Sequence, residues 1–192
     1  RKGLPERWTP SMGKPRHLLI ASEQGIGDDI LFLSCLPDLL RLTGMTTIET
    51  DIRLHAMLSR SFPGIGLIEK QLRAAPEDGA VHDYTEIVRA NGYSHAAFSG
   101  DLPSWFRTSL DGASEGAGYL KADAEECDRW KAWLESLGKG PYLGLSWRSG
   151  TLVTKQRSTG YLSPQELVSQ IPSDSFILVN LQYGDAEEEL VR

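Results

Sequence analysis

The sequence predicts an α/β protein with a Rossmann-like, doubly wound parallel sheet. Short apolar, strand-like runs alternate with helical segments from residue 17 onward. Residues 18–37 join such a run, a loop with two glycines and an apolar helix. Strands separated by helical crossovers favour parallel pairing, because each crossover returns the chain to the same end of the sheet. We therefore expect a ligand site beyond the carboxyl ends of the strands.

The first half of the chain is predicted to run strand, helix, strand, helix, strand. Apolar and β-branched runs indicate the strands, and helical spacing of apolar residues indicates the helices. Pro37 lies inside the first helical pattern and should kink or divide it, because proline has no backbone N–H. Pro63 ends the second helix. The expected bounds are 17–22, 46–51 and 66–69 for the strands, and 28–43 and 53–61 for the helices.

In the second half of the chain, the alternation of strand and helix signals is less continuous. Residues 99–118 are rich in Gly, Ser and Pro and are predicted to form a loop or lid. Apolar residues at helical spacing predict a helix over 124–137, and a new strand, helix and strand then follow. The other expected elements are short ones over 80–88 and 93–98, strands over 141–147 and 176–181, and a helix over 164–171.

Three parts of the chain are expected. Residues 1–15 hold three prolines and two glycines and are predicted to be an extended lead-in outside the core. Residues 16–138 form a first, acceptor-side Rossmann-like domain, and residues 139–192 begin a second. Doubly wound domains usually carry five or six strands, so the second domain is expected to be truncated. The chain would then be a fragment, or a homo-oligomer would cover the exposed sheet edge.

Composition excludes several classes of function. The net charge of −6 over 192 residues argues against a nucleic-acid-binding face. No apolar run approaches the roughly 20 residues of a membrane helix, and the start lacks the apolar core of a signal peptide, so a cytoplasmic protein is expected. Cys35 and Cys127 have neither metal-ligand nor disulfide-framework spacing and are predicted to be reduced thiols.

A loop with two glycines, Gly25-Ile26-Gly27, follows the first predicted strand. A glycine pair in this place is typical of dinucleotide-binding folds, and Glu49 or Asp51 could then bind a ribose at the end of the next strand. The third glycine of that motif is absent, because Ile30 stands in its place. The loop therefore matches the dinucleotide motif only in part.

Two carboxylates, Asp28 and Asp29, open the helix after this loop. They place negative charge where a pyrophosphate would rest, which opposes the attraction of a helix N-terminus for anions. A carboxylate here suits a general base that takes a proton from an acceptor hydroxyl. The alternative is that one of the two caps the helix and stabilises it by about 1 kcal/mol. The residues alone leave both interpretations open.

A basic loop follows the first strand of the predicted second domain. Three cations lie within ten residues of an otherwise acidic chain, together with hydroxyls, and this pattern suits a diphosphate. The alternative is a solvated loop whose cations pair with acids such as those at 187–189. No histidine pair has metal-ligand spacing. The proposed diphosphate ligands are Arg148, Ser149, Lys155, Arg157 and Ser158.

Two segments carry a resemblance to a known family. SEQGIGDDILFLSCLPDL, residues 22–39, resembles the EQGLGD-type segment of bacterial glycosyltransferase-like domains that follow tetratricopeptide repeats. YLKADAEECDRWKAWLESLGKGPYLGLSWRSG, residues 119–150, resembles the interdomain helix and second-domain opening of the same family. These domains are similar to family 9 heptosyltransferases and, more distantly, to O-linked N-acetylglucosamine transferases. The resemblance spans residues 14–185 and implies a two-domain GT-B fold.

The resemblance implies transfer of a sugar from a nucleotide-sugar donor to a hydroxyl acceptor on a glycan or protein, without metal or other cofactor. The Gly-Asp pair of heptosyltransferases matches Gly27-Asp28, which makes Asp28 the implied catalytic base. The basic loop is implied to hold the donor diphosphate, and the chain alone is expected to be inactive. The implied acceptor-side loop residues are Gln24, Gly25, Gly27 and Asp29.

Two other classes of function remain open from the sequence. One is a non-catalytic module, derived from a glycosyltransferase, that recognises a protein beside upstream helical repeats. The other is an NAD-dependent oxidoreductase that uses the Gly25 loop and places Asp51 on the ribose.

Overall fold

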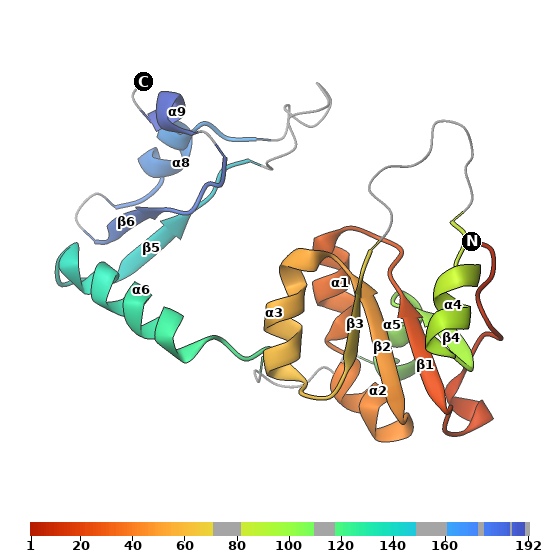
Figure 1. Cartoon of the computed structure of the whole chain (residues 1–192). Coiled ribbons are helices and arrows are strands. Elements are labelled where there is room, and N and C mark those ends of the chain that lie inside the picture. Colours follow the sequence, from red (N-terminus) through yellow and green to blue (C-terminus); the bar gives the residue numbers. More distant parts are fainter. Residues whose placement is uncertain (71–81, 110–117, 149–160, 173–174, 185, 191–192) are drawn as a thin grey trace. The chain divides into compact units, whose positions relative to one another are not determined.

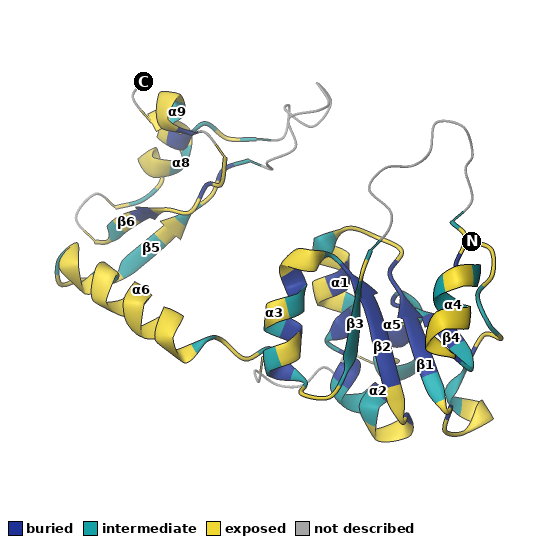
Figure 2. Ribbon diagram, in the orientation of Figure 1, coloured by how far each residue is buried: buried dark blue, intermediate teal, exposed yellow. Residues whose placement is uncertain are grey.

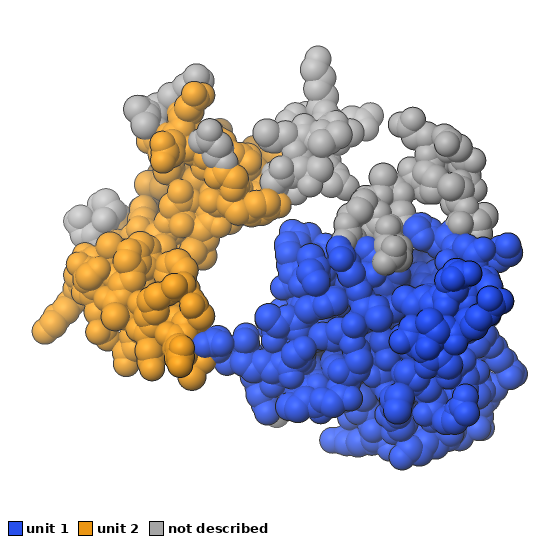
Figure 3. Space-filling view, in the orientation of Figure 1, with its two compact units in different colours: residues 1–123 blue, residues 124–192 orange. Residues whose placement is uncertain are grey.

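The structure is a computed structural model of the whole chain. It describes residues 1–70, 82–109, 118–148, 161–172, 175–184 and 186–190. The chain divides into two compact units, residues 1–123 and residues 124–192, which are coloured separately in Figure 3. The division falls before the helix over 124–136, whereas the sequence placed the boundary at residue 138.

Unit 1 is built on a parallel sheet of four strands in the order β3-β2-β1-β4 (Figure 1). All three strand pairs are parallel, and Leu19 of β1 is paired with Thr47 on one side and Ala96 on the other. The order confirms the predicted α/β class and is consistent with a Rossmann-like fold. The strands are β1 (His17–Ala21), β2 (Met45–Thr50), β3 (Gly66–Glu69) and β4 (His95–Phe98).

The helices of unit 1 connect these strands. The predicted break at Pro37 is confirmed, because α1 ends before it and α2 begins with Pro37 in its first turn. In the first turn the backbone N–H groups have no partner within the helix, so a proline without an N–H is tolerated there. The helices are α1 (Ile26–Leu33), α2 (Leu36–Leu42), α3 (Ile52–Ser61), α4 (Thr85–Asn91) and α5 (Asp101–Phe106), and a 3-10 turn, η1, covers Pro10–Met12.

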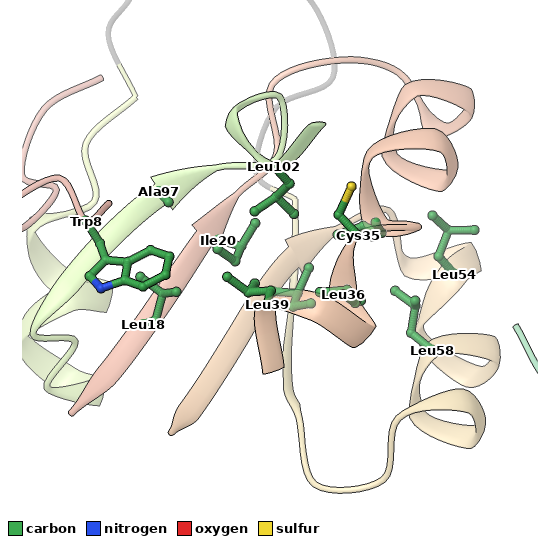
Figure 4. Close-up of a cluster of buried hydrophobic side chains, with 12 residues drawn as sticks. Trp8, Leu18, Ile20, Cys35, Leu36, Leu39, Leu54, Leu58, Ala97 and Leu102 are labelled. Carbon is green, nitrogen blue, oxygen red and sulfur yellow. The ribbon is translucent and has the colours of Figure 1, made fainter. Parts of the chain in front are cut away.

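Helices cover both faces of this sheet, which explains why β1 is an uninterrupted apolar run. Leu18 and Ile20 belong to the apolar cluster packed under the α1, α2, α3 and α5 helices (Figure 4). Leu19 and Ala21 point to the opposite face and pack with Tyr84 and other residues around α4. Figure 2 shows the resulting band of buried residues along β1 and β2.

The predicted lead-in is not outside the core. Trp8 is 1% exposed and belongs to the main apolar cluster. Its backbone N–H donates to Ala96 O (2.7 Å), its indole N–H donates to Gly13 O (2.8 Å), and its ring meets Trp105 edge to face. The expectation was wrong because prolines and glycines prevent regular structure but do not prevent a large aromatic ring from being buried.

The predicted lid at 99–118 was wrong in its first part, because α5 forms there. Leu102 is fully buried in the main cluster, and Asp101 accepts a hydrogen bond from Phe98 N (3.0 Å) at the start of the helix. Pro103 lies early in α5, where proline is tolerated. Residues 110–117 lie outside the described residues.

Unit 2 contains the predicted strand, helix and strand after the long helix. The elements are α6 (Ala124–Ser136), β5 (Tyr142–Leu145), α8 (Pro164–Ser169), β6 (Ile177–Asn180) and α9 (Glu187–Leu190). The strands β5 and β6 are parallel neighbours. The tryptophans of α6 are largely exposed, and Figure 2 shows this helix as almost wholly exposed.

Cys35 is buried and Cys127 is exposed, and neither is in a disulfide in this structure. Among the helices that the structure describes, none has the length and apolar character needed to cross a bilayer.

Candidate functional site

Polar side chains gather at the carboxyl edge of the unit 1 sheet. Ser22 directly follows β1, Thr50 ends β2, and Lys70 directly follows β3. Together with Asp29 of α1 they form one hydrogen-bonded group, which we call the carboxyl-edge cluster. Its position matches the place where open parallel sheets bind their ligands.

Asp29 is the buried carboxylate of this cluster, 1% exposed. Ser22 Oγ lies within hydrogen-bonding distance of both of its oxygens (2.6 and 2.8 Å), and Thr50 Oγ1 donates to Oδ2 (3.0 Å). Burial raises the pKa of Asp29 above its ordinary value, and the hydrogen bonds and the charge of Lys70 limit that rise. Asp29, expected on the acceptor-side loop, is instead enclosed under it.

Lys70 links the cluster to the glycine loop. Its ammonium donates to Ser22 Oγ (2.8 Å) and to the backbone carbonyl of Gln24. Its own backbone N–H donates to Thr50 O (2.9 Å), which fixes the end of β3 beside the end of β2. The cation therefore holds the loop after β1 from two strands away.

A second buried carboxylate, Glu49, lies in the same region. It is 2% exposed and accepts hydrogen bonds from Ser22 N (3.1 Å) and from the hydroxyl of Tyr84 (2.8 Å). Burial and the neighbouring Glu49 charge raise the pKa of Tyr84. Glu49, one of the two residues considered for a ribose, thus fastens the loop after β1 to the segment before α4.

The other ribose candidate, Asp51, caps α3. Its carboxylate accepts from Arg53 N (3.0 Å) and forms an ion pair with the guanidinium of the same arginine (3.0 Å). Both acids considered for a ribose, Glu49 in β2 and Asp51 after it, are therefore engaged by protein groups.

Asp28 is exposed at the start of α1. Its Oδ2 accepts a hydrogen bond from Gly25 N (3.1 Å), so the capping interaction considered from the sequence is present. Gly27 is exposed beside it. The two neighbouring acids thus have different environments, because Asp29 turns into the protein while Asp28 presents its carboxylate to solvent on the first turn.

In unit 2, the described part of the predicted diphosphate loop is held by two side chains. Gln182 Oε1 accepts from Trp147 N (3.1 Å) and Arg148 N (3.0 Å). The Arg148 guanidinium pairs with Glu189 (2.6 Å), which also accepts from the Trp147 indole (2.6 Å). Hydrogen bonds from Arg148 and Trp147 lower the pKa of Glu189. A phosphate would have to compete with Glu189 for Arg148.

The remaining predicted diphosphate ligands lie outside the described residues: Ser149, Lys155, Arg157 and Ser158. Within the described ranges, no group of three or more His, Cys, Asp or Glu side chains could hold a metal ion.

Sequence reasoning missed Ser22, Thr50 and Lys70. Each lies in the last two positions of a predicted strand or directly follows one, and that shared position was the available signal. It became meaningful only with the strand order, since β3 is separated from β1 by β2.

The chain is 29% identical over 189 residues to Protein FlbA of Caulobacter vibrioides, a match that covers 96% of this chain. The chain spans 31% of the length of that protein. No family model matches the chain, and no solved structure matches it.

Proposed function

We propose that this chain belongs to a GT-B glycosyltransferase and supplies its acceptor-side domain and the start of its nucleotide-sugar domain. The complete enzyme would transfer a sugar from a nucleotide-sugar donor to a hydroxyl of a glycan or protein. The observation that carries the proposal is Asp28, a solvent-facing carboxylate on the first turn of α1 at the carboxyl edge of a parallel sheet.

The geometry around Asp28 suits a general base. The Gly25 N–H holds one carboxylate oxygen, which orients the side chain, while the glycine loop provides room for an acceptor to approach. The cluster beneath the loop, with Asp29, Ser22 and Lys70, keeps the start of α1 in place. A base has to be oriented before it can take a proton efficiently.

The chemical step would be a single displacement. Asp28 takes the proton of the acceptor hydroxyl, and the oxygen of that hydroxyl bonds to the anomeric carbon of the sugar. The bond from that carbon to the diphosphate oxygen breaks, and the nucleoside diphosphate leaves with the electron pair. Lys155 and Arg157, which follow β5 in the sequence, are proposed to offset the charge on the leaving group.

A non-catalytic binding module is the second candidate, and the Gly25–Asp28 hydrogen bond is the observation that favours it. This bond is the carboxylate half of a capping box, and Gly25 has no side chain to make the other half. The acid at this position therefore has a structural role whether or not the protein is an enzyme. The two candidates differ in what a change of charge at Asp28 would do.

The test is Asp28→Asn in the complete gene product, assayed for transfer and hydrolysis with a panel of nucleotide sugars. Asparagine can still accept the Gly25 hydrogen bond but cannot act as a base. We expect turnover to fall by about 100-fold or more, with the melting temperature nearly unchanged. Glu86→Gln, which alters an exposed acid in the first turn of α4, is the matched control and should retain activity.

Two outcomes would contradict the proposal. Unchanged turnover in Asp28→Asn would reject the catalytic role of this carboxylate. Absence of transfer and hydrolysis with every nucleotide sugar, in a folded wild-type protein, would favour the non-catalytic module.

A further inference from the structure

Two hydrogen bonds from different parts of unit 1 meet on one peptide group of the glycine loop. The carbonyl of Gln24 accepts from the Lys70 ammonium. The N–H of Gly25, which belongs to the same planar peptide group, donates to the Asp28 carboxylate (3.1 Å). The orientation of this single peptide therefore determines whether the N–H points at Asp28.

Lys70 is well placed to fix that orientation. Its ammonium is held at the same time by Ser22 Oγ (2.8 Å), which in turn contacts the buried Asp29 (2.6 Å). Lys70 lies 46 residues beyond Gln24 and directly follows β3, so the position of Lys70 is set by the sheet and not by the glycine loop. The loop thus receives a fixed contact from outside itself.

The loop needs such a contact. It contains two glycines, Gly25 and Gly27, and the Gln24–Gly25 peptide directly precedes the first of them. Because the backbone of glycine has more conformational freedom than that of other residues, the loop alone does not fix the orientation of this peptide. A turned peptide would direct its carbonyl, and not its N–H, at the carboxylate. A cation at the carbonyl also polarises the peptide and strengthens the N–H as a donor.

We propose that Lys70 is a positioning residue for Asp28, acting through the Gln24–Gly25 peptide. The inference rests on the proposed function for the importance of Asp28 in transfer, whereas the coupling between Lys70 and the peptide stands on the contacts alone. The competing explanation is that Lys70 serves only to balance the charge of Asp29.

The first experiment measures the coupling without any activity. In NMR spectra of this chain, the Gly25 amide proton should shift with pH as the Asp28 carboxylate that it contacts gains a proton. Asp28→Asn should abolish that shift and so confirms its origin. In Lys70→Met we expect the pH-dependent shift to fall to about half or less, because the N–H is no longer held toward the carboxylate. Lys70→Arg should restore much of it.

The second experiment measures transfer in the complete gene product. Lys70→Met should lower kcat by about 10-fold and leave the KM for the nucleotide sugar unchanged, because the base is misplaced while the donor site is intact. Lys70→Arg should recover part of the loss. Lys131→Met removes an exposed lysine of α6 and should leave both constants unchanged.

An unaltered Gly25 shift in Lys70→Met would overturn the inference. So would an equal disturbance of amides throughout β1, β2 and β3, since a residue that merely balances Asp29 would loosen the whole edge of the sheet. A wild-type protein without transfer activity would refute the proposed function, and the Gly25 measurement would still decide whether Lys70 orients the peptide.

Discussion

In unit 1, helices cover both faces of a four-stranded sheet, whereas in unit 2 the described helices leave apolar side chains of a two-stranded sheet in solvent. The strand β1 of unit 1 contributes four consecutive fully buried residues, 18–21. In unit 2, Leu178 of β6 is 39% exposed, and Leu181, the first residue after that strand, is 62% exposed. An apolar cavity of about 190 Å³ lies in unit 2, lined in part by Leu145, Leu167 and Leu178.

This difference indicates that the two units are stabilised in different ways. Three or more strands with covered faces provide a core of their own, and a two-stranded sheet has little apolar surface to bury. In unit 2, polar contacts contribute a larger share of the stabilisation. Examples are the hydrogen bonds of Gln182 and the Arg148–Glu189 ion pair. Unit 1 should therefore be sensitive to lost volume and unit 2 to lost charge pairing.

The largest expected effect is a core truncation in unit 1. Leu36→Ala removes a fully buried side chain from the main cluster and should lower the free energy of unfolding of unit 1 by about 2–5 kcal/mol. Leu178→Ala, the same change at a partly exposed site in unit 2, should cost less than about 1 kcal/mol. Amide hydrogen exchange, followed on peptides from each unit, measures both, and equal losses would contradict the comparison.

A smaller effect is expected where a methyl group is added. The Cβ of Gly66→Ala would lie 2.4 Å from Thr47 Oγ1 and 3.2 Å from Thr47 Cβ, and Thr47 is buried, with its Oγ1 2.9 Å from His17 Nε2. Because Thr47 cannot move away easily, we expect a loss of about 1–3 kcal/mol.

Gly144→Ala is the matched change in unit 2. Its Cβ would lie 2.3 Å from the Leu181 Cδ1 atom, which is the end of a flexible and exposed side chain. Leu181 can turn aside, so the loss should be clearly smaller than for Gly66→Ala. Urea titration followed by amide peak intensities in each unit gives both values, and the reverse order would show that the backbone at Gly144 is less accommodating than its contacts indicate.

The smallest effects concern pH, where the two units should respond in opposite directions. Asp29 has a pKa raised above 3.8, mainly by burial, so its contribution to the stability of unit 1 is greatest below 3.8 and is lost as the pH rises through the folded pKa. Glu189 has a pKa lowered below 4.5 by Arg148 and Trp147, so its contribution is present above 4.5 and is lost as the pH falls.

The measurement compares wild type with Asp29→Asn and with Glu189→Gln between about pH 3 and pH 7. Relative to Asp29→Asn, wild-type unit 1 should lose stability as the pH rises above 3.8. Relative to Glu189→Gln, wild-type unit 2 should lose stability as the pH falls below 4.5. A difference that is constant with pH would reject the corresponding assignment.

Much of the fold could be predicted because its signals are local. An apolar run buried on both faces marked β1, and Pro37 marked the division between α1 and α2. Trp8 and α5 could not be predicted in this way, because the segments around them are rich in Pro, Gly and Ser. Their burial depends on partners far along the chain, such as Ala96 for Trp8.

The candidate site was predictable in place but not in detail. The glycine loop and Asp28 follow directly from the sequence, including the possibility of a cap. The reversal of environment between Asp28 and Asp29 depends on how the first turn of α1 faces the sheet. Lys70 depends on the register of β2 and β3, which one sequence does not reveal.

The chain before η1 also covers an edge of the sheet. The strand β4 is the last in the sheet order, and its outward N–H and C=O at Ala96 are taken by Glu6 O (3.0 Å) and Trp8 N (2.7 Å). Exposed strand edges recruit strands from other molecules. Removal of residues 1–8 by proteolysis would therefore expose this strand edge and take the Trp8 side chain out of the main cluster. Molecules shortened in this way should self-associate through the uncovered edge of β4.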